Sequence, residues 1–465
     1  MFYRLNDNYA LRGYQSATCM LVSRKGASYR ALKPLAFRVL MLCDGMTPLD
    51  ETSLTADEWS ALQQMHQQSV VTSSDAARPL DDWQTYRFHD NRFVQSVMWS
   101  LTGKCNFQCR HCFLDSPDSK WHELTTDEAM DVVDQMAECG VLSVHLTGGE
   151  PFVRKDFWQI VDRLCEKQIN IDVVYSNAWL MDEALLDVFD KRGLKPEFSI
   201  SFDGVGGWHD WMRGVTGAEQ HTLDVMQMCV RRGFSVNAAV SLHKGNAGVL
   251  RETLLKLAQI GVPKAKIGEV QPTDLWLQNH EGNLLTNGEY LDVVLDYIPK
   301  YAQDGRPLFV HFGNAVILHP DPEKCRVTAE RYPDDPSSAN LHLCSSARFA
   351  SYIAPDGRLL PCLPMTACAE QEIFPHIQEI GLKQALTDSF YLQFINRRVK
   401  DLLNVNPECG ACEHKYRCGG GCRAGALLTT HDLMGCNRAQ CFQYQHNYPA
   451  RFREVIDKAA ADSGK

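Results

Sequence analysis

The stretch "SLTGKCNFQCRHCFLDSP", residues 100–117, contains three cysteines within eight residues: Cys105, Cys109 and Cys112. A structural zinc site needs four closed ligands and is usually built from pairs of cysteines two residues apart. No fourth cysteine lies near this stretch, so the spacing leaves one position of a metal centre free. A metal centre with a free position can bind and transform another molecule.

The composition is that of an ordinary soluble protein with two or three domains, at 465 residues, 45% of them hydrophobic and 22% charged. The formal charge of -10 argues against a nucleic-acid partner held through its phosphates. The start, "MFYRLNDNYALRGYQ", lacks the pattern of a signal peptide, and no apolar window is long enough to span a membrane. We therefore expect a cytoplasmic protein that does not bind membranes.

The chain has 18 cysteines, which in a reducing compartment are more often metal ligands or buried residues than disulfides. Most of them cluster around the opening stretch and in the last third of the chain. The six isolated ones are expected to be small buried hydrophobes. These are Cys19, Cys43, Cys139, Cys165, Cys229 and Cys368.

Residues 1–85 resemble a small separate module of winged-helix type. "SATCMLVSR" alternates like a strand, and "KPLAFRVLMLCDG" has the character of an apolar helix ending at a glycine. A second helix, "TADEWSALQQMHQQ", opens with a capping box formed by Thr55 and Glu58. Eight Lys and Arg against nine Asp and Glu in this part do not favour a DNA-reading role.

Residues 86–320 repeat a helical pattern followed by a short apolar strand. The first strand is "VQSVMWSLT", and six helix–strand pairs follow, beginning with a helix capped by Thr125 and Glu128 and with the strand "VLSVHL". Such a run predicts an α/β fold with a parallel sheet, closed partly or fully into a barrel. In these folds the functional site lies at the carboxyl ends of the strands.

Polar and glycine residues follow the predicted strands at that edge. The second strand ends in "TGGEP", where glycines let the backbone approach a ligand closely and Glu150 adds an acceptor. Some of the others could be ordinary turn residues. They are Ser176 and Asn177, Ser201 and Asp203, Arg213, and Asn237, Ser241 and His243.

The CxxxCxxC spacing, with "GGEP" one strand later, resembles the radical S-adenosylmethionine (SAM) superfamily. The resemblance implies a partial (β/α)6 barrel in which the three cysteines hold three irons of a 4Fe-4S cluster while SAM chelates the fourth iron. It further implies that Gly148, Gly149, Glu150 and Pro151 form the turn that holds the methionine amino end. Ser176, Asn177, Ser201 and Asp203 would face the ribose or the carboxylate, and Arg213 would pair with the carboxylate. Reductive cleavage of SAM would give a 5′-deoxyadenosyl radical that abstracts hydrogen.

The last third of the chain holds a second group of cysteines after a Pro- and Asp-rich linker, residues 321–342. Cys344 and Cys362 are followed by "CGACEHKYRCGGGC". A zinc ribbon could use part of this pattern. Order and spacing in residues 343–450 resemble the SPASM extension of radical-SAM peptide maturases, which carries two auxiliary 4Fe-4S clusters. Residues 451–465 would be a C-terminal tail.

That resemblance implies a distal cluster on Cys409, Cys412 and Cys418 and a nearer one on Cys344, Cys362 and Cys422. Two assignments stay open. Cys441 fits the fourth distal position better than Cys436, and the nearer cluster is either completed by Cys325 or left with an iron open to substrate. The expected cofactors are thus SAM and three 4Fe-4S clusters.

In this context the N-terminal module resembles the recognition element with which ribosomal-peptide maturases hold a leader segment, by adding it as a strand to an exposed edge. The implied function is a maturase that forms a thioether or carbon–carbon crosslink in a ribosomal peptide, with flavodoxin or ferredoxin as electron donor. The alternatives are sulfatase-maturase-like oxidation of Cys or Ser, peptide epimerisation or decarboxylation, and an iron–sulfur redox sensor. No acid or base can be assigned: His243, His311 and Glu269 lie near strand ends, where histidines are often structural.

Overall fold

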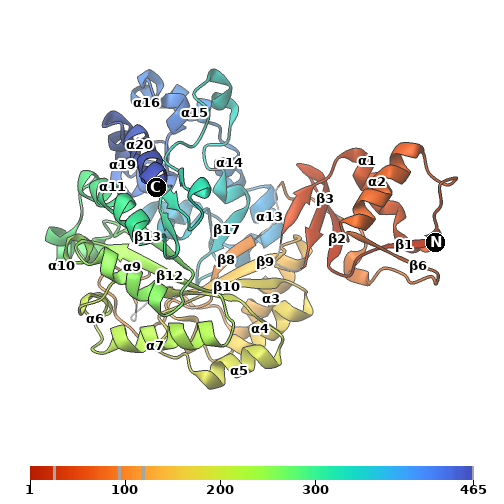
Figure 1. Cartoon of the computed structure of the whole chain (residues 1–465), viewed down its shortest axis with the longest axis horizontal. Helices are drawn as coiled ribbons and strands as arrows, with labels where there is room; N and C mark the ends of the chain where they lie inside the picture. The colour runs from red at the N-terminus through yellow and green to blue at the C-terminus, as the bar shows by residue number, and fades with distance from the viewer. Residues whose placement is uncertain (25–27, 93–95, 117–120, 463–465) are drawn as a thin grey trace.

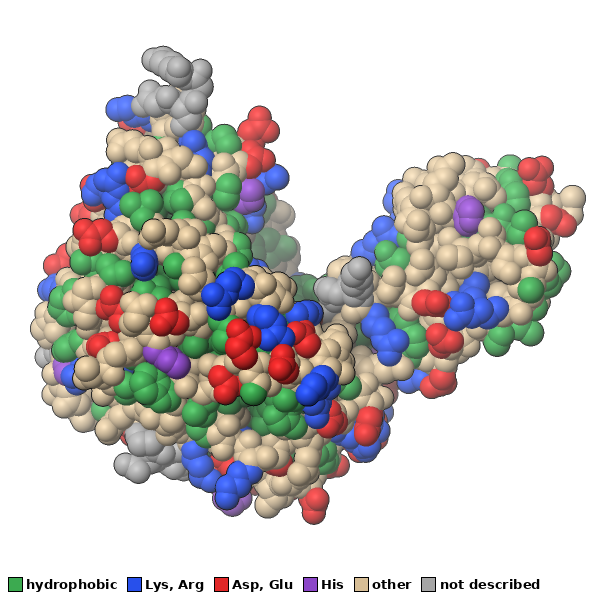
Figure 2. Space-filling view, turned by 60° about the horizontal axis from the view of Figure 1, so that its bottom comes forward, with side chains coloured by type: hydrophobic (Ala, Val, Ile, Leu, Met, Phe, Trp, Pro, Cys, Tyr) green, Lys and Arg blue, Asp and Glu red, His purple; other side chains and the backbone are tan. Residues whose placement is uncertain are grey.

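The computed structural model describes residues 1–24, 28–92, 96–116 and 121–462. Figure 1 shows an N-terminal module that projects from a larger body, and Figure 2 shows the two as lobes joined by a narrower neck. The body combines a curved sheet, wrapped by helices, with a helical C-terminal region that covers one end of it (Figure 1).

The central sheet has eleven strands in the order β16-β15-β14-β13-β12-β11-β10-β9-β8-β17-β18. Neighbouring strands from β8 to β14 run parallel, as the helix–strand repeat predicted. In the part of the chain that the structure describes, the two edge strands are not paired to each other, so the barrel is partial. The parallel strands are β8 (Ser96–Ser100), β9 (Ser143–Thr147), β10 (Asn170–Ser176), β11 (Glu197–Ser201), β12 (Val236–Leu242), β13 (Lys264–Glu269) and β14 (Phe309–Phe312).

Helices join these strands and cover the outer face of the sheet (Figure 1). The helix after the cysteine stretch has the predicted capping box, in which the Thr125 side chain accepts from the Glu128 backbone and the Glu128 carboxylate accepts from the Thr125 backbone. Its buried face joins one continuous core with the strands. The helices are α3 (Thr126–Glu138), α4 (Phe157–Glu166), α5 (Glu183–Lys191), α6 (Trp208–Arg213), α7 (Ala218–Arg231), α8 (Lys244–Ala247), α9 (Leu250–Gln259), α10 (Asp274–His280) and α11 (Asn287–Gln303).

The C-terminal region is built into this sheet. Strand β17 (Ala350–Ile353) pairs in parallel with β8, about 250 residues earlier in the chain, and is followed by β18 (Leu359–Leu360). At the other edge, β15 (Val316–Leu318) and β16 (Arg326–Val327) continue antiparallel from β14. The expected module therefore shares a sheet with the barrel.

The rest of the C-terminal region is helical. The expected tail belongs to a 15-residue helix, α20, that packs on α11 and buries Phe452 completely. None of the described helices is long and apolar enough to cross a membrane. The helices are α12 (Ile377–Ile380), α13 (Leu382–Thr387), α14 (Phe390–Asn396), α15 (Val399–Val405), α16 (Pro407–Ala411), α17 (Lys415–Cys418), α18 (Arg423–Thr430), α19 (Arg438–Gln445) and α20 (Tyr448–Asp462).

The N-terminal module is α+β, with two small sheets, in the orders β5-β1-β6 and β4-β3-β2-β7, packed with two helices around their own core. Its second helix has the predicted capping box of Thr55 and Glu58. Strand β4 forms one edge of the larger sheet, and all three of its residues are exposed. The elements are β1 (Phe2–Leu5), β2 (Tyr9–Tyr14), β3 (Ala17–Ser23), β4 (Tyr29–Ala31), α1 (Pro34–Leu42), β5 (Asp44–Pro48), α2 (Ala56–Gln67), β6 (Val71–Ser74) and β7 (Arg87–His89).

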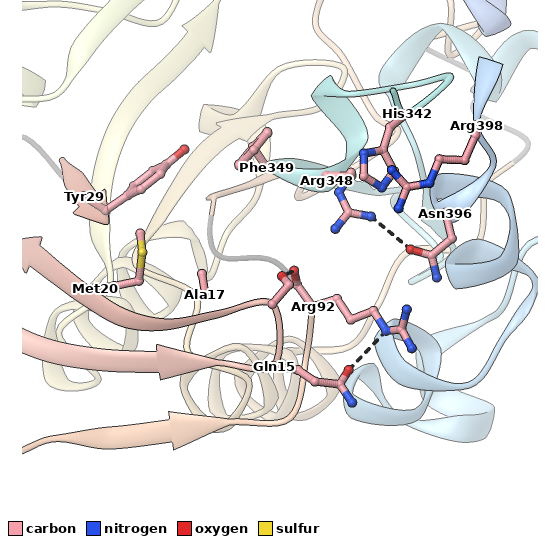
Figure 3. Close-up of a pocket in the computed structure, with 11 residues that line it drawn as sticks. Gln15, Ala17, Met20, Tyr29, Arg92, His342, Arg348, Phe349, Asn396 and Arg398 are labelled. Carbon is pink, nitrogen blue, oxygen red and sulfur yellow. Dashed lines mark hydrogen bonds between the residues drawn. The ribbon is translucent and has the colours of Figure 1, made fainter. Parts of the chain in front are cut away.

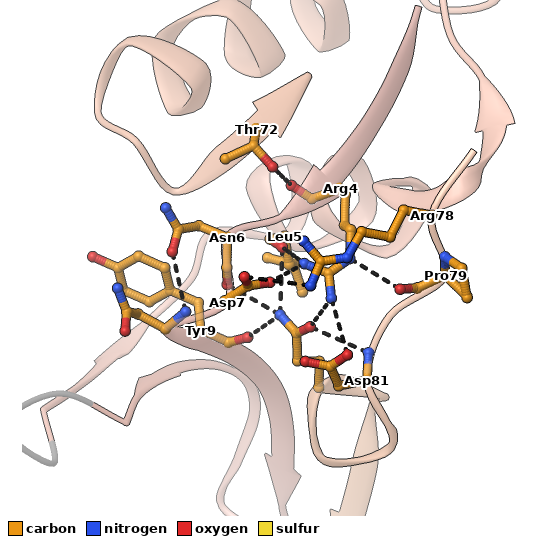
Figure 4. Close-up of polar contacts among 11 residues, drawn as sticks. Arg4, Leu5, Asn6, Asp7, Tyr9, Thr72, Arg78, Pro79 and Asp81 are labelled. Atoms are coloured by element: carbon orange, nitrogen blue, oxygen red, sulfur yellow. Dashed lines mark hydrogen bonds and ion pairs between the residues drawn. The ribbon is translucent and has the colours of Figure 1, made fainter. Parts of the chain in front are cut away.

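A buried polar network holds the two sheets of the module together (Figure 4). The Arg4 guanidinium donates to the Gln84 side chain (2.7 Å) and to the Pro79 carbonyl (3.0 Å), and it pairs with Asp7. Gln84 in turn donates to the Tyr9 carbonyl at 2.9 Å. Because buried polar groups must be hydrogen-bonded, this network fixes β1 against the segment that follows β6.

The module is anchored to the body by specific contacts. Buried Tyr14 donates its hydroxyl to the Gly140 carbonyl, just after α3 (3.0 Å), and stacks on His89, whose Nδ1 lies 3.1 Å from the Glu138 carbonyl. Apolar residues of β2 and β3 also pack on Leu142. These contacts fix β2 and β3 against the end of α3 and the residue before β9.

Candidate functional site

A cavity of about 210 Å³ opens at the carboxyl ends of the parallel strands, where the sequence places the site. All three cysteines of the opening stretch line it, together with residues from the ends of four further strands, one from the end of α6 and one from the C-terminal region. The lining comprises Cys105, Phe107, Cys109, His111, Cys112, Phe113, Leu114, Thr147, Gly148, Gly149, Tyr175, Ser176, Asn177, Ser201, Arg213, Ser241 and Leu363.

The glycine turn after β9 lies directly against the cysteine loop. Gly149 donates its backbone N–H to the Thr102 carbonyl (2.9 Å), and Glu150 donates to the Lys104 carbonyl (3.0 Å). A Cβ at Gly148 would lie 2.5 Å from the Thr102 carbonyl oxygen, and one at Gly149 would lie 2.2 Å from that of Lys104. The close packing therefore requires glycine at both positions.

The side chains of the three cysteines are partly buried from solvent. Burial is the main cause that raises the pKa of Cys105 to about 12, and it also raises the pKa of Cys109 despite the nearby Arg213. A thiolate becomes stable in such surroundings when a cation offsets the burial, and iron in a cluster supplies that charge. The donor set and the glycine cradle thus fit an iron–sulfur cluster with a small ligand beside it.

Glu150 is fully buried and accepts hydrogen bonds from residues at the end of the next strand, β10. Its carboxylate accepts from the Ser176 hydroxyl (3.1 Å) and from the backbone N–H groups of Asn177 (2.8 Å) and Phe152 (3.3 Å). Burial raises its pKa to about 7, partly offset by these donors. Glu150 and the adjoining Pro151 are both buried, and Glu150 fixes two residues that line the cavity.

Asp203 does not line the cavity but holds Arg213, which does. Its Oδ2 accepts from Arg213 Nε at 2.8 Å, and Arg213 Nη1 lies 3.5 Å from Cys109 Sγ. His209 Nδ1 accepts from the Asp203 backbone N–H at 3.1 Å and lies 3.3 Å from Asp203 Oδ2. Despite burial, the Arg213 charge holds the pKa of Asp203 well below its usual range. The structure therefore joins two residues that the resemblance placed on SAM separately.

Of the remaining polar residues that the sequence placed at strand ends, some line the cavity and others do not. Ser241 and Ser201 line the cavity. The expectation is wrong for Asn237, which is the second residue of β12 and so lies at its amino end, where it donates to the Ser199 hydroxyl at 3.0 Å. His243 is completely buried and caps α8 by accepting from the Gly245 N–H (3.1 Å), so it has the structural role considered above. Burial lowers the pKa of His311 and raises that of Glu269.

The sequence reasoning missed an aromatic cluster beside this site. The Trp211 ring lies 5.0 Å from the tilted ring of His243 and edge-on to Trp276 at 6.2 Å. Arg110 of the cysteine loop lies over the Trp211 ring at 4.8 Å and donates to the Trp211 carbonyl. Trp208 contacts the same histidine. The only sequence signal was the motif "WHDWM" after β11, which needs the fold to bring Trp276 to it.

The structure brings Cys344, Cys362 and Cys422 together, since each of the other two raises the pKa of the Cys362 thiol. Cys368 also raises the pKa of the Cys362 thiol, so it lies near this group, although the sequence suggested only a packing role for Cys368. Cys325 lies elsewhere: its thiol is 3.2 Å from the His319 N–H, in a small cavity between α11 and α20.

The second group of C-terminal cysteines has five members rather than four. Cys409 Sγ lies 3.5 Å from Cys436 Sγ, and Cys441 also raises the pKa of Cys409. Cys418 raises the pKa of the Cys441 thiol, and Cys412 raises the pKa of the Cys418 thiol. Cys436 and Cys441 are thus both near the other three. Among the described residues, no three His, Cys, Asp or Glu side chains converge closely enough to be identified as a site for a single metal ion.

The isolated cysteines mostly pack as expected. Cys43, Cys139, Cys229 and Cys368 are buried, and Cys19 is half-buried. The expectation is wrong for Cys165, which is exposed on α4 because it lies on the face turned away from the sheet.

Comparisons with known proteins agree with this geometry. Residues 99–258 match the radical SAM superfamily. The chain is 27% identical to a PqqA peptide cyclase of Granulibacter bethesdensis, over 72% of this chain and 84% of that protein. It is 23% identical to an AdoMet-dependent heme synthase of Methanosarcina barkeri, over 73% and 93%.

Among solved structures, Streptococcus suis SuiB bound to the precursor peptide SuiA superposes with a TM-score of 0.66 at 14% identity, covering 94% of this chain and 99% of that one. This likeness concerns the fold and extends over the N-terminal module and the C-terminal region. The superfamily implies SAM and a 4Fe-4S cluster as cofactors, in agreement with the cavity and its thiols. The match to the family covers residues 99–258, so it identifies a radical SAM domain in this part of the chain.

Proposed function

We propose that this enzyme modifies a ribosomally made precursor peptide by abstracting a hydrogen atom, and that it forms a thioether or carbon–carbon crosslink. The observation that carries the proposal is the cavity in which Cys105, Cys109 and Cys112 face the Gly148–Gly149 turn. Support for a peptide comes from the PqqA peptide cyclase relative and from the likeness to the SuiB–SuiA complex.

The three thiols would hold a 4Fe-4S cluster, and the turn of Gly148, Gly149, Glu150 and Pro151 would receive the methionine amino end of SAM. When bound, this pair supplies hydrogen abstraction from an unreactive carbon. Glu150 would orient Ser176 and Asn177 toward the ribose or carboxylate, and Ser201 would face the same region. Asp203 would hold Arg213 in place beside the cluster loop, ready to meet the SAM carboxylate.

The C-terminal cysteines would hold two auxiliary 4Fe-4S clusters in a SPASM domain. The nearer cluster would use Cys344, Cys362 and Cys422, and the location of Cys325 between α11 and α20 favours an iron left open to substrate. The distal cluster would use Cys409, Cys412 and Cys418, with either Cys441 or Cys436 as the fourth ligand. A flavodoxin or ferredoxin would supply electrons.

The N-terminal module would hold the leader of the peptide. Strand β4 is short, exposed and at the edge of its sheet, so its free backbone groups can pair with an extended segment. Holding the leader at the module would keep the rest of the peptide near the barrel at high effective concentration.

The test is anaerobic co-expression with the short peptide encoded nearest to the gene, followed by high-resolution mass spectrometry. Loss of two hydrogens per modification, with fragmentation blocked across one segment, is the expected result, and counting free thiols separates a thioether from a carbon–carbon bond. An unchanged mass with 5′-deoxyadenosine still formed would instead favour a folded-protein or small-molecule substrate. An unchanged mass with altered stereochemistry would indicate epimerisation. A protein that forms no 5′-deoxyadenosine would leave only a sensor role.

A further inference from the structure

A second, larger cavity of about 680 Å³ lies between the N-terminal module and the body (Figure 3). One wall is formed by Ala17, Met20 and Tyr29 of β3 and β4, and the other by the segments around β17 and α14. Its charged lining is entirely basic. The lining comprises Gln15, Ser16, Ala17, Met20, Tyr29, Arg92, His342, Arg348, Phe349, Asn396 and Arg398.

The three arginines of this cavity are bonded to neutral groups. Arg92 donates to the Gln15 side chain (3.1 Å) and Arg348 to the Asn396 side chain (2.9 Å), as Figure 3 shows, while Arg398 donates to the Asn340 carbonyl (2.6 Å). These bonds orient the guanidinium groups, and within the described part of the chain no carboxylate forms an ion pair with any of the three. Two acidic residues lie near these arginines in sequence: Asp90 pairs with Lys383 at 2.9 Å, and the Asp401 carboxylate accepts from the Arg398 backbone N–H.

The charges in the cavity repel one another. Burial, followed by the charges of Arg398 and Arg92, lowers the pKa of Arg348. Burial and the charges of Arg348 and Arg398 lower the pKa of His342 to about 4, so this ring is neutral. Concentrated positive charge in a chain of net charge -10 is a local feature that an anionic partner would stabilise.

The cavity also has an apolar component and a defined place in the fold. Phe349 and Tyr29 are 50% and 40% exposed at its surface. Tyr29 belongs to the open edge of β4, whereas Arg92 and Phe349 precede β8 and β17, at the strand ends opposite to the three cysteines. The cavity is therefore continuous with the exposed sheet edge and remote from the cluster loop.

We propose that this cavity binds an acidic, partly apolar segment of the precursor peptide, with its carboxylates on Arg348 and Arg398 and an apolar side chain on Phe349. The inference rests on the proposed function and extends it to the chemistry of the leader. The basic cavity and the cluster loop lie at opposite ends of β8, and a strand of five residues is about 17 Å long. An extended peptide needs at least about six residues to cover this distance, so the acidic segment must precede or follow the modified residue by at least that number.

The test measures binding to the reconstituted full-length enzyme by fluorescence anisotropy. The probe is a fluorescein-labelled peptide of three Glu-Leu-Glu-Ser repeats, and the matched probe has Gln in place of every Glu. We expect the Glu probe to bind at least tenfold more tightly at low salt, and this advantage to shrink as salt rises. The double variant Arg348→Gln/Arg398→Gln should lose at least tenfold in affinity for the Glu probe.

The matched control is Arg38→Gln/Arg451→Gln, which removes the same charge from sites outside the cavity and should change affinity less than about twofold. Phe349→Glu, which keeps both arginine hydrogen bonds, should also weaken binding and guards against misfolding of the double variant. Equal binding of both probes, or equal loss in the cavity and control variants, would overturn the proposal. So would displacement of the Glu probe by a 12-nucleotide single-stranded RNA at lower concentration than by unlabelled peptide, which would assign the cavity to nucleic acid.

This experiment separates the inference from the proposed function. The cavity variants should still cleave SAM without peptide at the wild-type rate, because the altered residues lie at the opposite strand ends from the cluster loop. A wild-type enzyme that binds the Glu probe through these arginines but forms no 5′-deoxyadenosine would contradict the proposed function alone.

Discussion

Asp203 holds Arg213 in place beside the cysteine loop: Asp203 Oδ2 accepts from Arg213 Nε at 2.8 Å, and both side chains are buried. The same guanidinium reaches to 3.5 Å from Cys109 Sγ. A carboxylate from the end of β11 thereby sets the position of a cation from the end of α6. This coupling means that substitutions at Asp203 act on the site through Arg213.

The substitution Asp203→Asn should leave Arg213 as a buried charge without its counter-ion. We expect a loss of about 3 to 5 kcal/mol in stability and at least tenfold weaker SAM binding, measured by urea unfolding and by calorimetry. The control Asp162→Asn breaks an ion pair with Arg192 whose acid is about half exposed, and should cost at most about 1 kcal/mol. Unchanged SAM affinity in the first variant would show that Arg213 does not meet SAM.

Replacing Cys105, Cys109 and Cys112 together by Ala should abolish SAM cleavage. With the two auxiliary clusters proposed for the C-terminal cysteines, iron content should fall only from about twelve to about eight atoms per chain. Iron analysis and chromatography of 5′-deoxyadenosine measure the two effects. Undiminished 5′-deoxyadenosine formation would contradict the assignment of these ligands.

The variant Cys412→Ala should separate the auxiliary iron from SAM cleavage. Since Cys412 lies with the distal cysteines, we expect loss of peptide product while part of the 5′-deoxyadenosine formation remains. Mass spectrometry of the peptide and a 5′-deoxyadenosine assay on the same sample measure this split. Normal product would mean that the distal cluster is structural scaffolding.

Gly149→Ala should disrupt the cavity, because the new Cβ would lie 2.2 Å from the Lys104 carbonyl oxygen. We expect at least tenfold weaker SAM binding and a lower yield of reconstituted cluster. Gly248→Ala is the matched control, since an added Cβ there has nothing within 4 Å and the backbone has helical angles. Equal behaviour of the two variants would show that the turn has room to move.

Glu150 should make the metal-free protein less stable as pH rises. Its pKa is about 7 when folded and about 4.5 when unfolded, so between these values the folded chain keeps a proton that the unfolded chain releases. Its contribution is therefore greatest below pH 4.5, declines up to about pH 7 and is then constant, a change of about 3 kcal/mol. Glu150→Gln should flatten this dependence in urea unfolding between pH 5 and 8, whereas the exposed Glu252→Gln should not.

The parallel strands of the barrel were predictable because each one after the first is an apolar segment that follows an amphipathic helix, and such periodicity is local. The capping boxes of Thr55 and Thr125 were predictable for the same reason, since they join residues three apart. The pairing of β17 with β8 was not, because nothing in either segment specifies a partner about 250 residues away.

At the candidate site, the sequence by itself determined which residues meet: the cysteine spacing, "GGEP" and the strand-end residues, because the carboxyl ends of parallel strands share one edge. Only the tertiary structure decided how they meet, with Arg213 on Asp203 and Ser176 on Glu150. It also formed the basic cavity, whose Arg92 and Arg348 come from distant segments. The physical reason is that periodicity fixes which face of an element is buried, whereas the partner of a buried charge depends on how the elements pack.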